Sequence, residues 1–312
     1  MCAGSIIPGT RAIPYKFRKG NIRMFAQLLV SGLVLGCMYG LLGIGTSLIF
    51  KASGVMNQAQ GDMLTLGAYL GYTFYGILKL PFIVSLLLTM ILMIAFGYLL
   101  QIAVVSKIIK RVGTVSVMLA TSAISYIIQN SSRFIWGAVT LSFPSILKKS
   151  TVKIFGAVYQ TEKLLCVGVS FLLMIALHLF LSKTKFGIAL RAAATDSSAA
   201  QTFGIDVSMA NAVTWGLSAG VGAIAGILVG PLYGVYTSLG ANLNGKGFSG
   251  AVMGGMGNIY GAIVGGIILG ILETFISGYV SSKYKDLIAY AVLLVFLFVR
   301  PRGLFNSDAV DE

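Results

Sequence analysis

Residues 24–50 read MFAQLLVSGLVLGCMYGLLGIGTSLIF, an unbroken run without a charged side chain. An α-helix rises about 1.5 Å per residue, so about 20 apolar residues cross the hydrocarbon core of a bilayer. This run exceeds that length. A basic segment before an apolar run also resembles a signal peptide, but the apolar part of a signal peptide spans only about 7–15 residues. We therefore predict a retained first transmembrane helix.

The rest of the chain has the same character. Its 312 residues are 57% hydrophobic and only 10% charged, with a mean hydropathy of +0.90. A soluble domain carries about 25% charged residues. The 39 glycines fit membrane helices, in which glycine lets backbones approach closely. We predict an all-α polytopic membrane protein embedded in a lipid bilayer.

Further stretches are apolar enough to be spans. Together with the first they lie near 24–50, 62–79, 82–106, 113–131, 163–182, 211–235, 240–256, 259–279 and 286–300. The net charge of +14 does not indicate nucleic acid, because the basic residues cluster in short segments beside these spans. The clusters fall at 11–23, 107–111, 183–191 and 300–302, and the positive-inside rule assigns them to the cytoplasm.

Nine crossings would place the chain ends on opposite sides, whereas the basic clusters place both in the cytoplasm. We therefore predict about eight full crossings, with 57–79 or 240–256 as a re-entrant segment, so that the count is eight or nine. The predicted domains are a cytoplasmic extension (1–23), one transmembrane domain (24–306) and a short tail (307–312).

Glycine patterns suggest two related halves with broken helices. The first half has Gly40, Gly43 and Gly45 followed by Gly61-Asp62, and the second has a dense glycine run over 250–270. Such interruptions expose backbone groups that can line a pathway, although close helix packing explains them equally simply. Our candidate pathway residues are Asn57, Gln60, Gly61, Asp62, Gly254, Gly255, Gly257, Asn258 and Glu273.

Two of these candidates, Asp62 and Glu273, are acids within or beside apolar spans, where ionisable groups usually face a cavity or a partner. No nucleophile or metal cluster accompanies them, so we predict no catalysis. Residues 240–246 (GANLNGK) resemble a phosphate-binding loop, but Gly247 stands where Ser or Thr must bind magnesium. We predict no nucleotide site and no bound cofactor.

Residues 183–206 (KTKFGIALRAAATDSSAAQTFGID) form a polar segment between spans. Thr195 or Asp196 can accept hydrogen bonds from the first turn of a helix, and Gly204 can adopt the left-handed conformation that ends one. We predict a short helix over about 197–203 outside the membrane. Composition alone leaves a solvated loop equally possible.

Four segments together resemble the branched-chain amino acid ABC transporter permeases. They are GLLGIGTSLIFKASGVMNQAQGDMLTLGAYLGY (40–72), IALRAAATDSSAAQTFGI (188–205), AVMGGMGNIYGAIVGGIILGILE (251–273) and RPRGLF (300–305). The resemblance spans about 24–306. This sequence departs from the family pattern at Gln60, often His, at Asn258, usually Ser, and in its N-terminal extension.

The resemblance implies a multi-pass permease subunit in the bacterial plasma membrane. It would belong to an ATP-driven importer for leucine, isoleucine, valine or a related small polar solute. Its implied partners are a second related permease, two ATPase subunits that bind the ATP, and an extracytoplasmic solute-binding protein. In that family a cytoplasmic loop, here 183–210, docks into the ATPase. The candidate coupling residues are Arg191, Asp196, Phe203 and Gly204.

Alternatives remain open from the sequence. A stand-alone ion-coupled transporter or channel would need intramembrane ion ligands, and Asp62 and Glu273 are too few to decide. A membrane enzyme lacks a catalytic cluster. Within the family, related permeases are associated with urea or with sugars and nucleosides.

Overall fold

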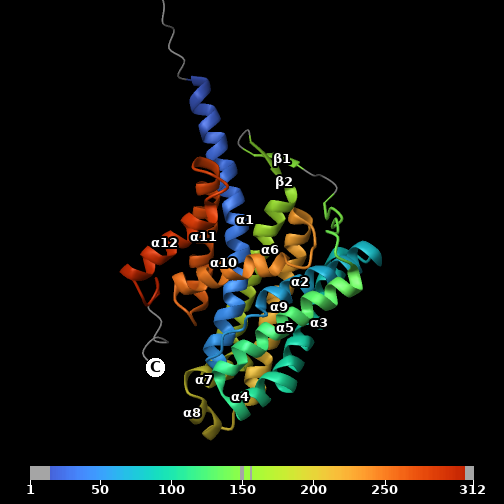
Figure 1. Cartoon of the computed structure of the whole chain (residues 1–312), viewed down its shortest axis with the longest axis vertical. Helices are drawn as coiled ribbons and strands as arrows, with labels where there is room; N and C mark the ends of the chain where they lie inside the picture. Colours follow the sequence, from blue (N-terminus) through green and yellow to red (C-terminus); the bar gives the residue numbers. More distant parts are fainter. Residues whose placement is uncertain (1–14, 148–150, 155–156, 306–312) are drawn as a thin grey trace, which may run out of the picture.

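The part of the chain that the structure describes folds almost entirely into helices, with one small β-hairpin (Figure 1). The computed structural model describes residues 15–147, 151–154 and 157–305. The predicted tail (307–312) and residues 1–14 of the predicted extension lie outside these ranges. The helices are α1 (Tyr15–Ser53), α2 (Gln60–Gly71), η1 (Tyr72–Ile77), α3 (Phe82–Leu100), η2 (Gln101–Val105), α4 (Ser106–Val112), α5 (Thr114–Trp136), α6 (Thr161–Lys183), α7 (Lys185–Thr195), α8 (Ser197–Thr202), α9 (Val207–Tyr233), α10 (Leu239–Gly254), α11 (Ile259–Tyr279) and α12 (Lys285–Val299).

The hairpin joins β1 (Thr151–Ile154) to β2 (Ala157–Gln160), with Thr151 opposite Gln160 in antiparallel register. It lies between α5 and α6. The sequence pattern does not predict this hairpin, because strands of four residues are too short to show a clear alternation of apolar and polar residues.

Within the described ranges, five helical segments are long and apolar enough to cross a membrane. They are Met24–Ser53, Phe82–Val112, Thr161–Lys183, Val207–Tyr233 and Ile259–Tyr279. Burial separates them: the most apolar window of α9 is 89% buried inside the protein, whereas that of α6 is 28% buried. The α9 helix therefore forms the centre, and α6 leaves most of its apolar surface for lipid. The chain is an all-α polytopic membrane protein, as predicted, while eight or nine crossings stay a prediction.

The two halves pack reciprocally around this centre. The α1 helix packs along α11 and against α10, while α9 packs along α3 and against α2. The short helices α2 and α10 also contact each other. In the chain, α2 and α3 follow α1, and α10 and α11 follow α9. Each of the long helices α1 and α9 thus packs on the pair that follows the other one. This exchange is consistent with the predicted two-half architecture.

Glycines make these helix crossings possible. At the α2–α10 crossing, a Cβ on Gly240 would lie 1.7 Å from the Gly61 carbonyl oxygen. At the α10–α11 crossing, a Cβ on Gly254 would lie 1.8 Å from the Gly261 carbonyl oxygen. Real Cβ atoms do not come so close to a backbone. Close packing, one of the two explanations that the sequence left open, therefore accounts for much of the glycine run over 250–270.

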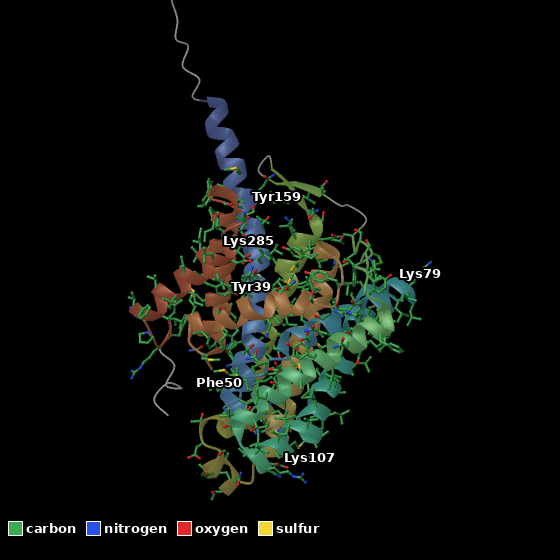
Figure 2. The ribbon with its side chains drawn as sticks, in the orientation of Figure 1. Tyr39, Phe50, Lys79, Lys107, Tyr159 and Lys285 are labelled. Atoms are coloured by element: carbon green, nitrogen blue, oxygen red, sulfur yellow. The ribbon has the colours of Figure 1, made fainter. Side chains whose placement is uncertain are left out.

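The molecule has two distinct ends (Figure 1). The α1 helix begins at the end that also carries the β-hairpin, and α4, α7 and α8 lie at the opposite end. Figure 2 shows Tyr159 and Lys285 toward the first end and Lys107 at the second. The start of α1 and the clusters at 107–111 and 183–191 therefore lie at opposite ends. This geometry does not support the prediction that all four basic clusters share the cytoplasmic side.

Candidate functional site

The polar segment 183–206 forms two capped helices at one end of the molecule. The Thr184 hydroxyl accepts a hydrogen bond from the Gly187 N–H (3.0 Å) and starts α7. The Asp196 carboxylate accepts from the N–H groups of Ser198 and Ala199 (both 2.9 Å) and starts α8. Gly204 ends this helix with φ +80°. Of the two caps that the sequence allowed, Asp196 is the one used, and a helix lies where the pattern predicted one.

These two helices present a fixed but exposed surface. The α7 helix packs against α1, α6 and α9, with Leu190 and Ala193 buried. The side chain of Phe203 is 86% exposed, and Arg191 is also exposed. An exposed phenylalanine at the end of α8, a helix that packs on α7 and α9, is a suitable anchor for a partner protein.

The first helix break, between α1 and α2, is held by buried amide groups. The Asn57 side-chain oxygen accepts from the Ala59 N–H (3.0 Å). The Gln60 side chain donates to the Ser218 carbonyl (3.1 Å) and accepts from the Ser218 hydroxyl (2.9 Å). The Ser218 hydroxyl oxygen also lies 2.8 Å from the Gly45 carbonyl oxygen of α1. Gln60 therefore ties α2 to α1 and α9, and both Asn57 and Gln60 are buried within the subunit.

The Asp62 carboxylate, one residue past Gly61, binds α5. It accepts hydrogen bonds from the Ser125 hydroxyl and from the Gln129 side-chain amide (2.9 Å). Its side chain is buried. Burial of a carboxylate is costly unless hydrogen bonds satisfy it, and two neutral donors from α5 do so here.

The second break lies between α10 and α11. Gly255 and Gly257 adopt φ values of +111° and +84°, which disfavour any other residue. The Asn258 side chain accepts from the N–H groups of Tyr260 (3.0 Å) and Gly261 (3.2 Å) and caps α11. Asn258 stands where the family that the sequence resembles usually has Ser. Because Ser and Asn are similarly good N-caps, the cap on α11 is preserved.

The C-terminal segment Arg300-Pro-Arg-Gly-Leu-Phe305 closes this break from the other side. The N–H groups of Leu304 and Phe305 donate to the carbonyls of Met253 (3.0 Å) and Gly254 (3.1 Å) at the end of α10. Helix ends leave carbonyl groups without intrahelical partners. The motif therefore satisfies the end of α10 and fixes the broken segment in place.

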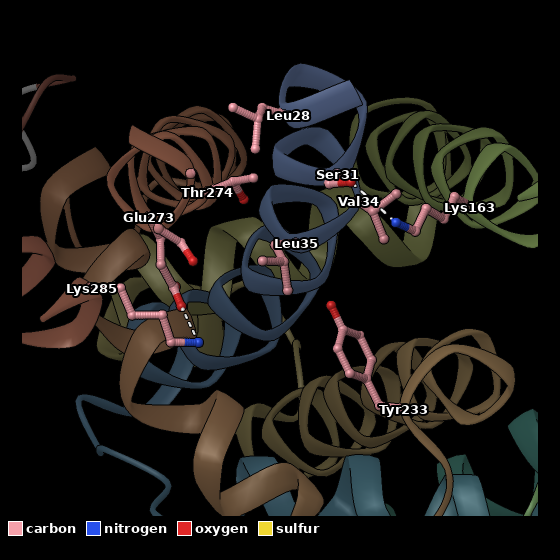
Figure 3. A pocket seen from close by; sticks show the side chains of 11 residues that line it. Leu28, Ser31, Val34, Leu35, Lys163, Tyr233, Glu273, Thr274 and Lys285 are labelled. Atoms are coloured by element: carbon pink, nitrogen blue, oxygen red, sulfur yellow. Dashed lines mark hydrogen bonds and ion pairs between the residues drawn. The ribbon is translucent and has the colours of Figure 1, made fainter. Parts of the chain in front are cut away.

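Glu273 lies in a buried ionic cluster (Figure 3). Its carboxylate accepts a hydrogen bond from the Tyr39 hydroxyl (2.7 Å) and pairs with Lys246 (2.6 Å) and Lys285 (3.3 Å). Lys246 also pairs with Asp286 (2.7 Å). The Glu273 side chain is 1% exposed, whereas that of Asp286 is 57% exposed. The cluster ties α1, α10, α11 and α12 together. Lys285 lies toward the end where α1 begins, and Tyr39 lies nearer the middle of the molecule (Figure 2).

Comparison with known proteins identifies the chain. The model of one protein family, described as the permease component of branched-chain amino acid transport systems, matches residues 28–297. The chain belongs to this family. It is therefore a multi-pass permease of the plasma membrane, as the sequence predicted.

Individual relatives agree along nearly the whole length. The high-affinity branched-chain amino acid transport system permease protein LivH of Salmonella typhimurium is 30% identical over 92% of this chain and 97% of its own. LivH of Escherichia coli K12 is 31% identical, also over 92% of this chain and 97% of its own. BraD of Pseudomonas aeruginosa is 29% identical over 94% of this chain and 99% of its own. No solved structure matches the chain.

This permease brings only some of the predicted site residues together. Asn57, Gln60, Gly61 and Asp62 gather at the first break, and Gly61 contacts α10 through Gly240. Gly254, Gly255, Gly257 and Asn258 gather at the second break, while Glu273 belongs to the ionic cluster, and the coupling residues lie at the end that carries α7 and α8. Their roles in transport stay predictions.

Sequence reasoning missed Lys246, the main partner of Glu273. Lys246 is the last residue of the segment 240–246, which resembles a phosphate-binding loop but lacks its Ser or Thr. A lysine within an apolar stretch needs a partner for the same reason as a glutamate, so its position in 240–256 was a usable signal.

Proposed function

We propose that the chain is the permease subunit of an ATP-driven ABC importer for leucine, isoleucine, valine or a related small polar solute. Its partners would be a second related permease, two ATPase subunits and an extracytoplasmic binding protein. The chain itself would be non-catalytic and would bind no cofactor, since the ATPase subunits bind ATP. One observation carries the proposal: a family member presents a rigid, exposed two-helix element, α7 and α8, at one end of its membrane domain.

We assign the end that carries α4, α7 and α8 to the cytoplasm. The basic clusters at 107–111 and 183–191 lie there and support this orientation. The α1 helix then begins on the extracytoplasmic side. The C-terminal segment contacts Gly255, which is near the cytoplasmic end of α1 because Gly257 lies beside Lys51. The described chain, from the start of α1 to Phe305, then runs from outside to inside and crosses an odd number of times, which favours nine crossings over eight.

In this proposal the two helix breaks contribute to the solute route between paired permeases. Asn57–Asp62 and Gly254–Asn258 are the segments that would move or become exposed when the two permeases rock. The N-terminal end of a broken helix can attract a carboxylate through its dipole and free N–H groups. Such an interaction would suit a solute with an amino acid's carboxylate.

Purification and uptake test the proposal. We expect the tagged chain, extracted in mild detergent, to co-purify with ABC ATPase subunits. Proteoliposomes of that complex, loaded with ATP and given the binding protein outside, should take up leucine even after ionophores dissipate ion gradients. Ion-driven uptake by the chain alone would support the rival secondary transporter or channel. If urea, ribose or nucleosides compete with uptake and isoleucine and valine do not, the chain imports one of those related solutes and not branched-chain amino acids.

Phe203 provides a sharper test of coupling. We expect Phe203→Ala to lower ATP-driven uptake by about tenfold or more, because an exposed aromatic anchor at a docking surface contributes about 2 kcal/mol. Phe134→Ala is the matched control, since Phe134 is 92% exposed but lies on α5. Uptake and ATPase activity should be measured for both variants in the reconstituted complex. Equal activities of the two variants would contradict the assigned coupling surface.

A further inference from the structure

A small cavity opens beside the ionic cluster, bounded by α1, α6, α9, α11 and the start of α12 (Figure 3). Its volume is about 170 Å³. One water needs roughly 10–15 Å³ on this measure, and drug-sized ligands occupy about 300–1,000 Å³. The cavity therefore suits a small solute rather than a peptide.

Lysine side chains give this cavity a positive character. Lys163 lies in the first turn of α6, and its ammonium group donates to the Ser31 hydroxyl of α1 (3.1 Å). Among the residues that the structure describes, no carboxylate lies within ion-pair distance of Lys163. Lys285 also lines the cavity, at 3.3 Å from Glu273.

The charges around the cavity do not balance. Two ammonium groups, on Lys163 and Lys285, line the cavity together with one carboxylate, on Glu273. Glu273 is already engaged by Lys246 and by the Tyr39 hydroxyl. The cavity can therefore accept one further negative charge, and Lys163 is the cation left to pair with it.

The other walls of the cavity are apolar or carry hydroxyl groups. Leu28, Val34 and Leu35 of α1 line one side, and Tyr233 of α9 points toward the cavity from another (Figure 3). An aliphatic side chain can cover the leucine and valine surface while a carboxylate pairs with an ammonium group. This is the division of labour found in small-molecule sites, where apolar walls bind and few polar groups orient.

We propose that this cavity is a binding site for the carboxylate of an aliphatic amino acid, with Lys163 as its principal cation. The inference rests on the proposed function and names residues that would receive the solute on the extracytoplasmic side. The cavity lies toward the end where α1 begins, opposite α7 and α8. A solute delivered from outside would therefore meet Lys163 before it reached the helix breaks.

Ligand-observed NMR on the full chain tests the site directly. The chain is placed in nanodiscs of zwitterionic lipid, without the binding protein, and saturation-transfer signals are titrated for leucine, 4-methylpentanoate and leucinamide. We expect leucine and 4-methylpentanoate to bind and compete, and leucinamide, which lacks the carboxylate, to bind at least about tenfold more weakly. Leucinamide that binds as well as leucine would overturn the proposal.

Variants of Lys163 separate the site from general folding effects. Lys163→Met should weaken leucine binding about tenfold or more, whereas Lys163→Arg should retain it. Lys283→Met is the matched control, because Lys283 is exposed, lies just before α12 and does not line the cavity. Unchanged leucine affinity in Lys163→Met refutes the site. If that variant instead loses a co-purifying anionic phospholipid, the cavity holds a lipid phosphate and the proposal fails.

The outcome is distinguishable from failure of the importer role. Suppose that the complex takes up leucine with ATP, but that Lys163→Met binds leucine as well as the unaltered chain does. The proposed function would then stand and this site would be wrong. Absence of ATP-driven uptake would remove the proposed function itself.

Discussion

Replacing Glu273 by leucine is expected to destabilise the protein by about 3 kcal/mol, the order found when one partner of a buried ion pair is removed. The variant leaves Lys246 and Lys285 beside a single exposed carboxylate, Asp286. It also removes the acceptor of the Tyr39 hydroxyl, which is buried between α1 and α11. Thermal unfolding of the detergent-solubilised chain, followed by fluorescence size exclusion, measures the loss as a melting temperature lower by several degrees.

A double-mutant cycle shows whether charge or shape is responsible. The variant Lys246→Met/Glu273→Leu removes both members of the pair, so it should recover most of the loss, because apolar replacement of a buried pair is often neutral. Asp286→Asn should cost less than about 1 kcal/mol, since Asp286 is 57% exposed. Additive losses in the double variant would show that Glu273 and Lys246 do not act as a pair.

Local features of this chain could be predicted from the sequence because their causes are local. Asp196 and Gly204 define α8 by capping and by a left-handed conformation, and neither needs a distant partner. The glycines at 255 and 257 likewise mark a break that the backbone itself requires. Membrane class follows from apolar segments whose length the bilayer dictates.

Contacts between distant segments could not be predicted. Glu273 was identified as a costly intramembrane acid, but its partners Lys246 and Tyr39 come from α10 and α1, and a single sequence does not show which helices adjoin. The same limit applied to Gln60, whose partner Ser218 belongs to the other half. The positive-inside rule places every basic cluster in the cytoplasm from its charge alone. It cannot show that the start of α1 and the cluster at 107–111 lie at opposite ends of the folded chain.

The crossing of α2 and α10 yields the second large effect. We expect Gly240→Ala to destabilise the protein by about 3 kcal/mol, at the upper end of overpacking losses. The new Cβ would lie 1.7 Å from the Gly61 carbonyl oxygen and 2.6 Å from the Thr65 hydroxyl oxygen. Backbone cannot move aside as a side chain can, so the two helices must separate. The same thermal unfolding assay measures the loss.

Gly168→Ala is the matched control, because Gly168 lies on the exposed face of α6 and a Cβ there meets nothing within 4 Å. Alanine is a better helix former than glycine by roughly 0.5–1 kcal/mol, so this variant should be neutral or slightly more stable. The two substitutions are chemically identical, and their effects should differ in sign. Separating α2 from α10 should also displace Gln58, whose carbonyl accepts from the Asn244 amide of α10 (3.2 Å). Uptake should therefore fall in Gly240→Ala even at temperatures where the protein stays folded, and full uptake there would show that the crossing does not position the first helix break.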